Sequence, residues 1–129
     1  MPAASKLTVV VVDDQLTIRS LVRTGLNQIA INEVREFGAA EDALKYIKVH
    51  GPHVVISDYN MPGMDGLELL KGMREDVRCK NTAFILLTGR ADKELVQRAV
   101  QLGANNYLVK PFTIATLKQK IEQVVGALT

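Results

Sequence analysis

Three short runs of consecutive apolar residues constrain the fold of this chain more than any other feature. The runs are VVVV at 9–12, VVI at 54–56, which Ser57 follows, and FILL at 84–87. A strand with one face in water alternates apolar and polar side chains, whereas a strand that is covered on both faces is apolar throughout. The runs therefore predict interior strands of a parallel sheet with helices on both faces.

Segments of helical periodicity separate these runs. We predict strands at 7–12, 33–37, 53–57, 83–87 and 106–109, and helices at 15–29, 41–49, 66–75, 92–102 and 113–127. The second strand, EVREF, alternates, so we place it at an edge of the sheet. Five strand–helix units in succession predict an α/β fold, a doubly wound sandwich.

Two of the helices carry clear apolar stripes, and these stripes predict packing against the sheet. The first stripe consists of Ile18, Leu21, Val22, Leu26 and Ile29. The last consists of Ile114, Leu117, Ile121, Val124, Val125 and Leu128. Gly103 follows the fourth predicted helix and is a natural residue to end it.

The size and composition exclude several classes of protein. A chain of 129 residues suits one domain, which we expect to span 1–129. A net charge of +2 is too small to favour nucleic acid or an anionic membrane. One cysteine, Cys79, and two histidines, His50 and His53, exclude an intrachain disulfide and a zinc site of the usual kind. We expect these three side chains to be exposed, and the protein to be a cytoplasmic monomer.

Polar residues follow four of the predicted strands. Asp13 and Asp14 follow the first, Asp58 the third, Thr88 the fourth and Lys110 the fifth. The carboxyl ends of parallel strands lie at one edge of a sheet, where ligands bind. Each residue also has a plain structural interpretation, since Asp14 could cap a helix and the others could be ordinary loop residues. Their occurrence at four separate strand ends favours a common site.

The charges at this edge predict a metal ion. Three carboxylates and the ammonium of Lys110 sum to −2, and a divalent cation would neutralise them. Oxygen ligands suit Mg²⁺, Mn²⁺ or Ca²⁺ better than zinc. Asp58 would then be free to attack phosphorus and form an acyl phosphate. Lys110 and the Thr88 hydroxyl would stabilise the phosphoryl oxygens.

These residues lie in four motifs, which are the aspartate pair after VVVV, ISDYNMPGMDGLELL at 56–70, LLTGR at 86–90 and YLVKPFT at 107–113. The motifs resemble those of the CheY-like receiver domain, in particular of its single-domain chemotaxis members. The resemblance covers nearly the whole chain. It implies a flavodoxin-like (βα)5 fold with the strand order 2-1-3-4-5 that is known from CheY.

The resemblance also implies a role for each site residue. Asp58 is the phosphoacceptor, and Thr88 and Lys110 contact the phosphoryl group. The expected ligands of Mg²⁺, with Mn²⁺ as a possible substitute, are the side chains of Asp13, Asp14 and Asp58 and the backbone carbonyl of Asn60. The Lys110–Pro111 bond is expected to be cis, and Asn60 is expected to tune the rates. Arg90 departs from the family, since many chemotaxis members carry an acidic residue there, and we expect it to change the rate of self-hydrolysis.

The output implied by the resemblance is a change at the face formed by 92–102, 106–109 and 113–127. Thr88 moves toward the phosphoryl group and Tyr107 turns inward. The other expected output residues are Lys93, Val96, Val100 and Lys120. The implied partners are a CheA-like histidine kinase that donates the phosphoryl group and a FliM-like flagellar switch protein. The alternative role is a phosphate sink or relay that drains phosphoryl groups from a shared kinase. The alternative partner to the switch protein is then a sink or phosphatase protein.

Functions from other classes fit the residues less well. A flavodoxin-like FMN carrier needs a phosphate loop rich in Ser, Thr and Gly after the first strand, where this chain has two aspartates. A haloacid-dehalogenase phosphatase needs a second Asp two residues after the first, where this chain has Gln15 or Leu16. A receiver-like domain without phosphorylation usually lacks an acidic residue, the Thr or the Lys. We therefore expect a signalling protein that catalyses only its own phosphorylation and dephosphorylation.

Overall fold

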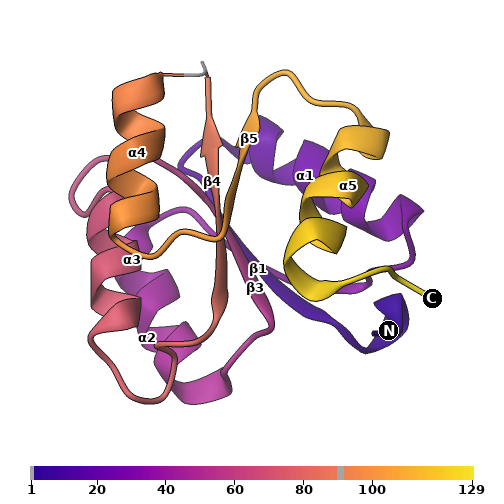
Figure 1. Cartoon of the computed structure of the whole chain (residues 1–129), viewed down its shortest axis with the longest axis horizontal. Helices are drawn as coiled ribbons and strands as arrows, with labels where there is room; N and C mark the ends of the chain where they lie inside the picture. Colours follow the sequence, from indigo (N-terminus) through magenta and orange to yellow (C-terminus); the bar gives the residue numbers. More distant parts are fainter. Residues whose placement is uncertain (1, 90–91) are drawn as a thin grey trace.

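The structure is a computed structural model that describes residues 2–89 and 92–129 (Figure 1). Its strands are β1 (Thr8–Val12), β2 (Glu33–Phe37), β3 (Val54–Asp58), β4 (Ala83–Thr88) and β5 (Asn106–Val109). Its α-helices are α1 (Leu16–Gln28), α2 (Ala40–His50), α3 (Gly66–Arg74), α4 (Lys93–Gln101) and α5 (Ile114–Val125), and a short 3-10 helix, η1 (Ala4–Lys6), precedes β1. Every predicted strand and helix is present, with its ends within two residues of the prediction.

The strands form one parallel sheet in the order β2-β1-β3-β4-β5, as predicted. The strand β2 lies at an edge, and its first three side chains alternate between exposed and buried positions, whereas its last two are half-buried. The apolar runs lie in β1, β3 and β4, the three interior strands. Strands covered on both faces thus account for the unbroken apolar runs of the sequence.

Helices α2, α3 and α4 cover one face of the sheet, and α1 and α5 cover the other (Figure 1). Alternate residues of β1 point to opposite faces of the sheet and contribute to the two apolar clusters that lie between the sheet and the helices. Val10 and Val12 belong to the apolar cluster under α2 and α3, whereas Val9 and Val11 belong to the cluster under α1 and α5. This two-layer packing holds the strand ends, and with them the polar residues, in one rigid row.

Local signals define several helix ends. Asp65 and Glu68 form a reciprocal capping box at the start of α3. Gly103, with a φ of 104°, ends the fourth helix in the left-handed region, as predicted. No helix in the described part of the chain is long and apolar enough to cross a bilayer.

Three side chains differ from the prediction, and one of them is Ile114, which was placed in the last apolar stripe but is 38% exposed. Cys79 was expected to be exposed, and this is wrong, since its side chain is only 2% exposed and its Sγ lies 3.4 Å from the carbonyl oxygen of Met73. The segment between α3 and β4 folds back over the core, although its sequence, RCKN, is polar. Leu21 was placed in the buried stripe of α1 but is 55% exposed, because the helix packs through Val22 and Leu26 instead. His50 and His53 are exposed, as predicted.

Candidate functional site

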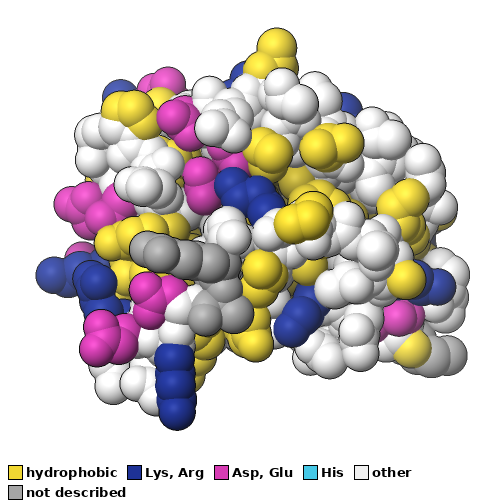
Figure 2. Space-filling model, turned by 90° about the horizontal axis from the view of Figure 1, so that it is seen from above, with side chains coloured by type: hydrophobic (Ala, Val, Ile, Leu, Met, Phe, Trp, Pro, Cys, Tyr) yellow, Lys and Arg dark blue, Asp and Glu magenta, His cyan; other side chains and the backbone are white. Residues whose placement is uncertain are grey.

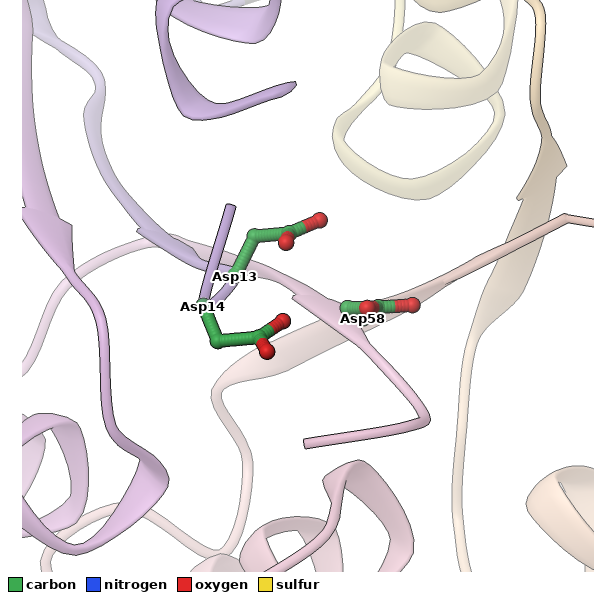
Figure 3. Close-up of side chains that lie close together, drawn as sticks. All are labelled: Asp13, Asp14 and Asp58. Atoms are coloured by element: carbon green, nitrogen blue, oxygen red, sulfur yellow. The ribbon is translucent and has the colours of Figure 1, made fainter. Parts of the chain in front are cut away.

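Three carboxylates lie together at the carboxyl edge of the sheet (Figure 3). Asp13 and Asp14 leave the end of β1, and their side chains extend toward the side on which Asp58 lies at the end of β3. One carboxylate oxygen from each residue lies within 4.8 Å of the others. Asp13 and Asp58 are 0% and 7% exposed, whereas Asp14 is exposed. The predicted acidic site is therefore formed.

The register of the sheet accounts for this proximity. Val12 pairs with Ser57 across β1 and β3, so the residues that follow them, Asp13 and Asp58, are neighbours. The backbone of Asp13 is held on both sides, because its N–H donates to Phe37 O at 3.1 Å and its carbonyl oxygen accepts from Arg19 Nη1 at 2.6 Å. The position of Asp13 thus depends on β2 and α1 as well as on its own strand.

The side chain of Asp13 is also fixed by a local hydrogen bond. Its Oδ1 accepts from the backbone N–H of Gln15 at 2.9 Å. Gln15, and not Asp14, is the N-cap of α1, and it makes no side-chain capping bond. The interpretation of Asp14 as a helix cap is therefore wrong, and its carboxylate remains at the mouth of the site.

Asp58 is the last residue of β3, and hydrogen bonds hold both its side chain and its backbone. Its Oδ1 accepts from Tyr59 N–H at 2.9 Å, and its carbonyl oxygen accepts from the Ser57 hydroxyl at 2.9 Å. A Cβ atom at Gly66 would clash with the same carbonyl oxygen. Gly66, the second glycine of the MPGMDG motif, thus lets α3 begin directly against the strand that presents Asp58.

Lys110 supplies the positive charge of the site. Its Nζ lies 3.5 Å from Asp58 Oδ1 and 3.7 Å from Asp13 Oδ2. Its backbone N–H donates to Thr88 O at 2.7 Å, which ties the ends of β4 and β5 together. The Lys110–Pro111 bond is cis, as the resemblance implied. The ammonium group therefore faces both buried carboxylates.

Burial raises the pKa of the Asp13 carboxyl above its usual value. The Gln15 amide opposes this shift, as does Lys110, whereas the charges of Asp58 and Asp14 add to it. The buried Oδ2 of Asp13 has no hydrogen-bond partner among the described residues. Within that part of the chain, this oxygen has only the ion pair with Lys110 and no hydrogen bond. A buried carboxylate oxygen of this kind, beside two further carboxylates, belongs to the donor set that a hard divalent cation prefers.

Thr88 and Asn60 lie beside Asp58. Thr88, the last residue of β4, is 5% exposed, and Asn60 is exposed in the loop after β3. Together they line an open cavity of about 360 Å³. Its other lining residues are Asp58, Tyr59, Gly89, Asp92 and Leu95. The sequence did not single out Asp92, although its position as the N-cap of α4 is a readable signal.

The comparison with known proteins agrees with this geometry. Residues 9–122 match the response regulator receiver domain family. The chain belongs to this family.

Curated relatives of this receiver match nearly its whole length. A probable chemotaxis protein CheY from Rhizobium etli is 47% identical over 128 residues, which is 99% of each chain. Chemotaxis protein CheY-3 of Vibrio cholerae is 37% identical over 122 residues, covering 95% of this receiver and 94% of that protein. The solved structure of Vibrio cholerae chemotaxis protein CheY4 has a TM-score of 0.85 at 36% identity, covering 92% of this chain and 98% of that one.

The residues expected at the output of the receiver lie on α4, β5 and α5. Tyr107 is half-buried in β5, and Lys120 Nζ lies 4.4 Å from the centre of its ring. Lys93 and Val100 are exposed on α4, and Val96 is half-buried. Arg90, expected to tune the rates, lies outside the described residues.

An apolar groove adjoins the acidic site on the side of α1. It has a volume of about 560 Å³ and is lined by Ile18, Leu21, Thr24, Gly25, Gln28, Gly89, Lys110, Pro111, Phe112 and Ile114. Figure 2 shows charged side chains in the middle of this end of the molecule, with apolar side chains beside them. The sequence missed the groove because it assigned Leu21 and Ile114 to buried stripes.

Proposed function

We propose that this receiver is the phosphoacceptor switch of a chemotaxis two-component system, and that Asp58 takes a phosphoryl group from a histidine kinase. The observation that carries the proposal is the position of the Asp58 carboxylate. It faces Lys110 on one side, lies within reach of two further carboxylates, and lines an open cavity. The names of the relatives, which are chemotaxis proteins, support the assignment to chemotaxis.

The metal that fits these residues is Mg²⁺, with Mn²⁺ as a substitute. The side chains of Asp13, Asp14 and Asp58 and the backbone carbonyl of Asn60 would hold it. Two observations favour this fit, namely the buried Oδ2 of Asp13, which accepts no hydrogen bond from the described residues, and the oxygen-only donor set. When bound, the ion supplies positive charge that offsets the charge of the phosphoryl oxygens.

The chemical step is a displacement at phosphorus. A carboxylate oxygen of Asp58 forms a bond to the phosphorus atom, and the bond from phosphorus to the imidazole nitrogen of the donor breaks. The electron pair of that bond stays with the imidazole. Lys110 pairs with a phosphoryl oxygen in place of its contact with Asp58, and the Thr88 hydroxyl donates to another. Attack of water on the acyl phosphate later restores the carboxylate.

The groove beside Lys110 is the expected contact surface for the donor protein. A phosphohistidine must reach Asp58, so the protein that carries it must cover the adjoining surface. The outward rim of the groove on α1 is uncharged, since it is formed by Leu21, Thr24 and Gln28. An apolar helix of the donor suits such a surface.

The output is expected at the face of α4, β5 and α5. Phosphorylation adds about one negative charge at Asp58, which draws the Thr88 hydroxyl inward and lets Tyr107 follow. The contact between Lys120 and the ring of Tyr107 lies on this face and would change with the ring. The proposed partner is a flagellar motor switch protein, and a cytoplasmic phosphate sink is the alternative role.

Acetyl phosphate provides the direct test. With Mg²⁺ we expect the intact mass of the wild type to rise by one phosphoryl group, and without Mg²⁺ we expect no gain. Asp58→Asn should gain no mass at that position. Phosphorylation at position 58 in Asp58→Asn, or equal phosphorylation of the wild type with and without Mg²⁺, would refute the proposal. Binding of a flagellar switch protein only by the beryllofluoride-activated receiver would separate the motor role from the sink.

A further inference from the structure

The loop between β3 and α3, residues 59–65, borders the acidic site and carries Asn60. The backbone carbonyl of Asn60 is one of the proposed ligands of the metal. A carbonyl oxygen is placed by the conformation of its loop, because it has no side-chain rotamers of its own. What holds this loop therefore affects the geometry of the site.

Contacts close in sequence hold the two ends of the loop. The N–H of Gly66 donates to Tyr59 O at 2.9 Å. At the other end, Glu68 N–H donates to Asp65 Oδ1 at 2.8 Å, and Asp65 N–H donates to Glu68 Oε1 at 3.0 Å. These bonds close the loop on itself and on the first turn of α3.

A residue from a different helix holds the centre of the loop. The N–H of Met64 donates to Oε1 of Glu41 at 2.7 Å. Glu41 lies in the first turn of α2, 23 residues earlier in the chain. A short hydrogen bond to a charged acceptor is stronger than one between neutral groups.

Gly63 provides independent support for this contact. Its φ of 76° lies in the left-handed region, which glycine adopts readily. A Cβ atom at this position would lie 2.7 Å from the same Oε1 of Glu41. The loop therefore turns closely around the carboxylate, and a side chain at Gly63 would displace it.

The carboxylate of Glu41 is itself well placed and charged. Helix α2 is fixed to the core through Ala40, Ala43 and Ile47, which are buried. The Met64 amide lowers the pKa of Glu41, so the group is ionised throughout the neutral range. A firmly packed helix thus presents an ionised acceptor to the loop.

On the basis of the function proposed above, we propose that Glu41 is a positioning residue for the metal site. Through Met64 it holds the loop in the conformation that presents the Asn60 carbonyl toward Asp13 and Asp58. Loss of this contact allows the loop to move, which weakens the binding of Mg²⁺. Once Mg²⁺ is saturating, the chemical step at Asp58 is unaffected.

The test compares four full-length proteins: the wild type, Glu41→Ala, Glu41→Gln and Asp42→Ala. Calorimetric titration with Mg²⁺ is expected to show about threefold to tenfold weaker binding for Glu41→Ala. Glu41→Gln should stay within about twofold of the wild type, because its amide oxygen still accepts from Met64. Asp42→Ala removes the same charge from the same exposed turn and should also bind as the wild type does.

Two further measurements distinguish positioning from a general loss of structure. Hydrogen exchange at the Met64 amide should accelerate in Glu41→Ala and not in Asp42→Ala. The rate of phosphorylation by acetyl phosphate should fall in Glu41→Ala at limiting Mg²⁺ and recover at saturating Mg²⁺. A rate that stays low at saturating Mg²⁺ would contradict the positioning role.

The outcomes separate this proposal from the function on which it rests. If the wild type and Glu41→Ala bind Mg²⁺ equally well, the role of Glu41 is refuted and the receiver chemistry stands. If Glu41→Gln or Asp42→Ala is as weak as Glu41→Ala, charge and not the hydrogen bond is responsible, and the proposal is refuted. If the wild type itself binds no Mg²⁺, the proposed function fails, and the role of Glu41 fails with it.

Discussion

The ammonium nitrogen of Lys110 lies 3.5 Å from Oδ1 of Asp58, the two residues being 52 positions apart in the chain. The same nitrogen lies 3.7 Å from Asp13, so Lys110 occupies a place close to that of the expected cation. These distances give Lys110 two opposing effects, because it repels the metal and attracts the phosphoryl group.

Lys110→Met should separate these effects. Removal of the ammonium lowers the repulsion of Mg²⁺, and we expect binding to tighten about threefold to tenfold. Phosphorylation by acetyl phosphate should nevertheless slow by roughly 10²-fold, since a charge that stabilises the transition state is lost. Titration calorimetry and intact mass measure the two quantities. Lys118→Met, at an exposed position on α5, should change neither; weaker Mg²⁺ binding in Lys110→Met would contradict the reasoning.

Asp13→Asn should stabilise the metal-free protein. Because burial raises the folded-state pKa of Asp13, its charged form costs stability at neutral pH. This cost is absent below the unfolded pKa and appears as the pH rises through the folded pKa. We expect the melting temperature of Asp13→Asn to lie about 2–5 °C above that of the wild type at pH 7 without Mg²⁺. The difference between the two melting temperatures should become smaller toward pH 4.

Calorimetric melting with and without Mg²⁺ checks this prediction. The asparagine oxygen still accepts from the Gln15 amide, so the hydrogen bond is retained. Added Mg²⁺ should stabilise the wild type and have less effect on Asp13→Asn. A lower melting temperature for Asp13→Asn in the absence of metal would show that the buried charge is already compensated.

Gly66→Ala should destabilise the fold although alanine favours helices. A Cβ at Gly66 collides with the backbone of Asp58 and Tyr59, which cannot shift without moving β3. We expect a loss of more than about 2 kcal/mol in the free energy of unfolding, measured with urea. Gly72→Ala in the same helix is the matched control. Its Cβ meets only the flexible end of Leu44, so an equal loss there would contradict the explanation.

Leu21→Glu should impair phosphotransfer from a protein donor and leave the reaction with acetyl phosphate unchanged. The substitution places a charge in the apolar groove beside Lys110 without touching the carboxylates. We expect the KM for the phosphorylated donor domain of the kinase to rise roughly fivefold to thirtyfold. Val49→Glu, at an exposed valine on α2, should have no such effect. Equal loss with both donors would indicate damage to the site itself.

The thiol of Cys79 should be unreactive in the folded protein. Its side chain is buried, and burial raises the pKa of the thiol, so little reactive thiolate is accessible. We expect labelling by a disulfide reagent to be at least about a hundredfold slower in buffer than in denaturing urea. Rapid labelling in buffer would mean that the segment between α3 and β4 opens readily.

The fold and the acidic site were both predictable from the sequence, for the same physical reason. Continuous apolar runs occur only where a strand is covered on both faces, so β1, β3 and β4 had to be interior strands of a parallel sheet. Parallel strands end at one edge, so residues placed just after them had to meet. The proximity of Asp13 and Asp58 follows from that rule and from the pairing of Val12 with Ser57.

Some features depend on contacts between separate elements, and no periodic pattern in the sequence marks these contacts. Only the tertiary structure decided them. Leu21 and Leu26 look alike in the stripe of α1, yet the way α1 packs beside α5 buries one and leaves the other beside a groove. Cys79 is buried by a loop whose composition is polar. The bond from Met64 to Glu41 joins a loop to a helix 23 residues away. Hydrophobic patterning specifies which face of each helix or strand is buried. The way in which whole helices, strands and loops pack together determines which side chains of different elements come into contact.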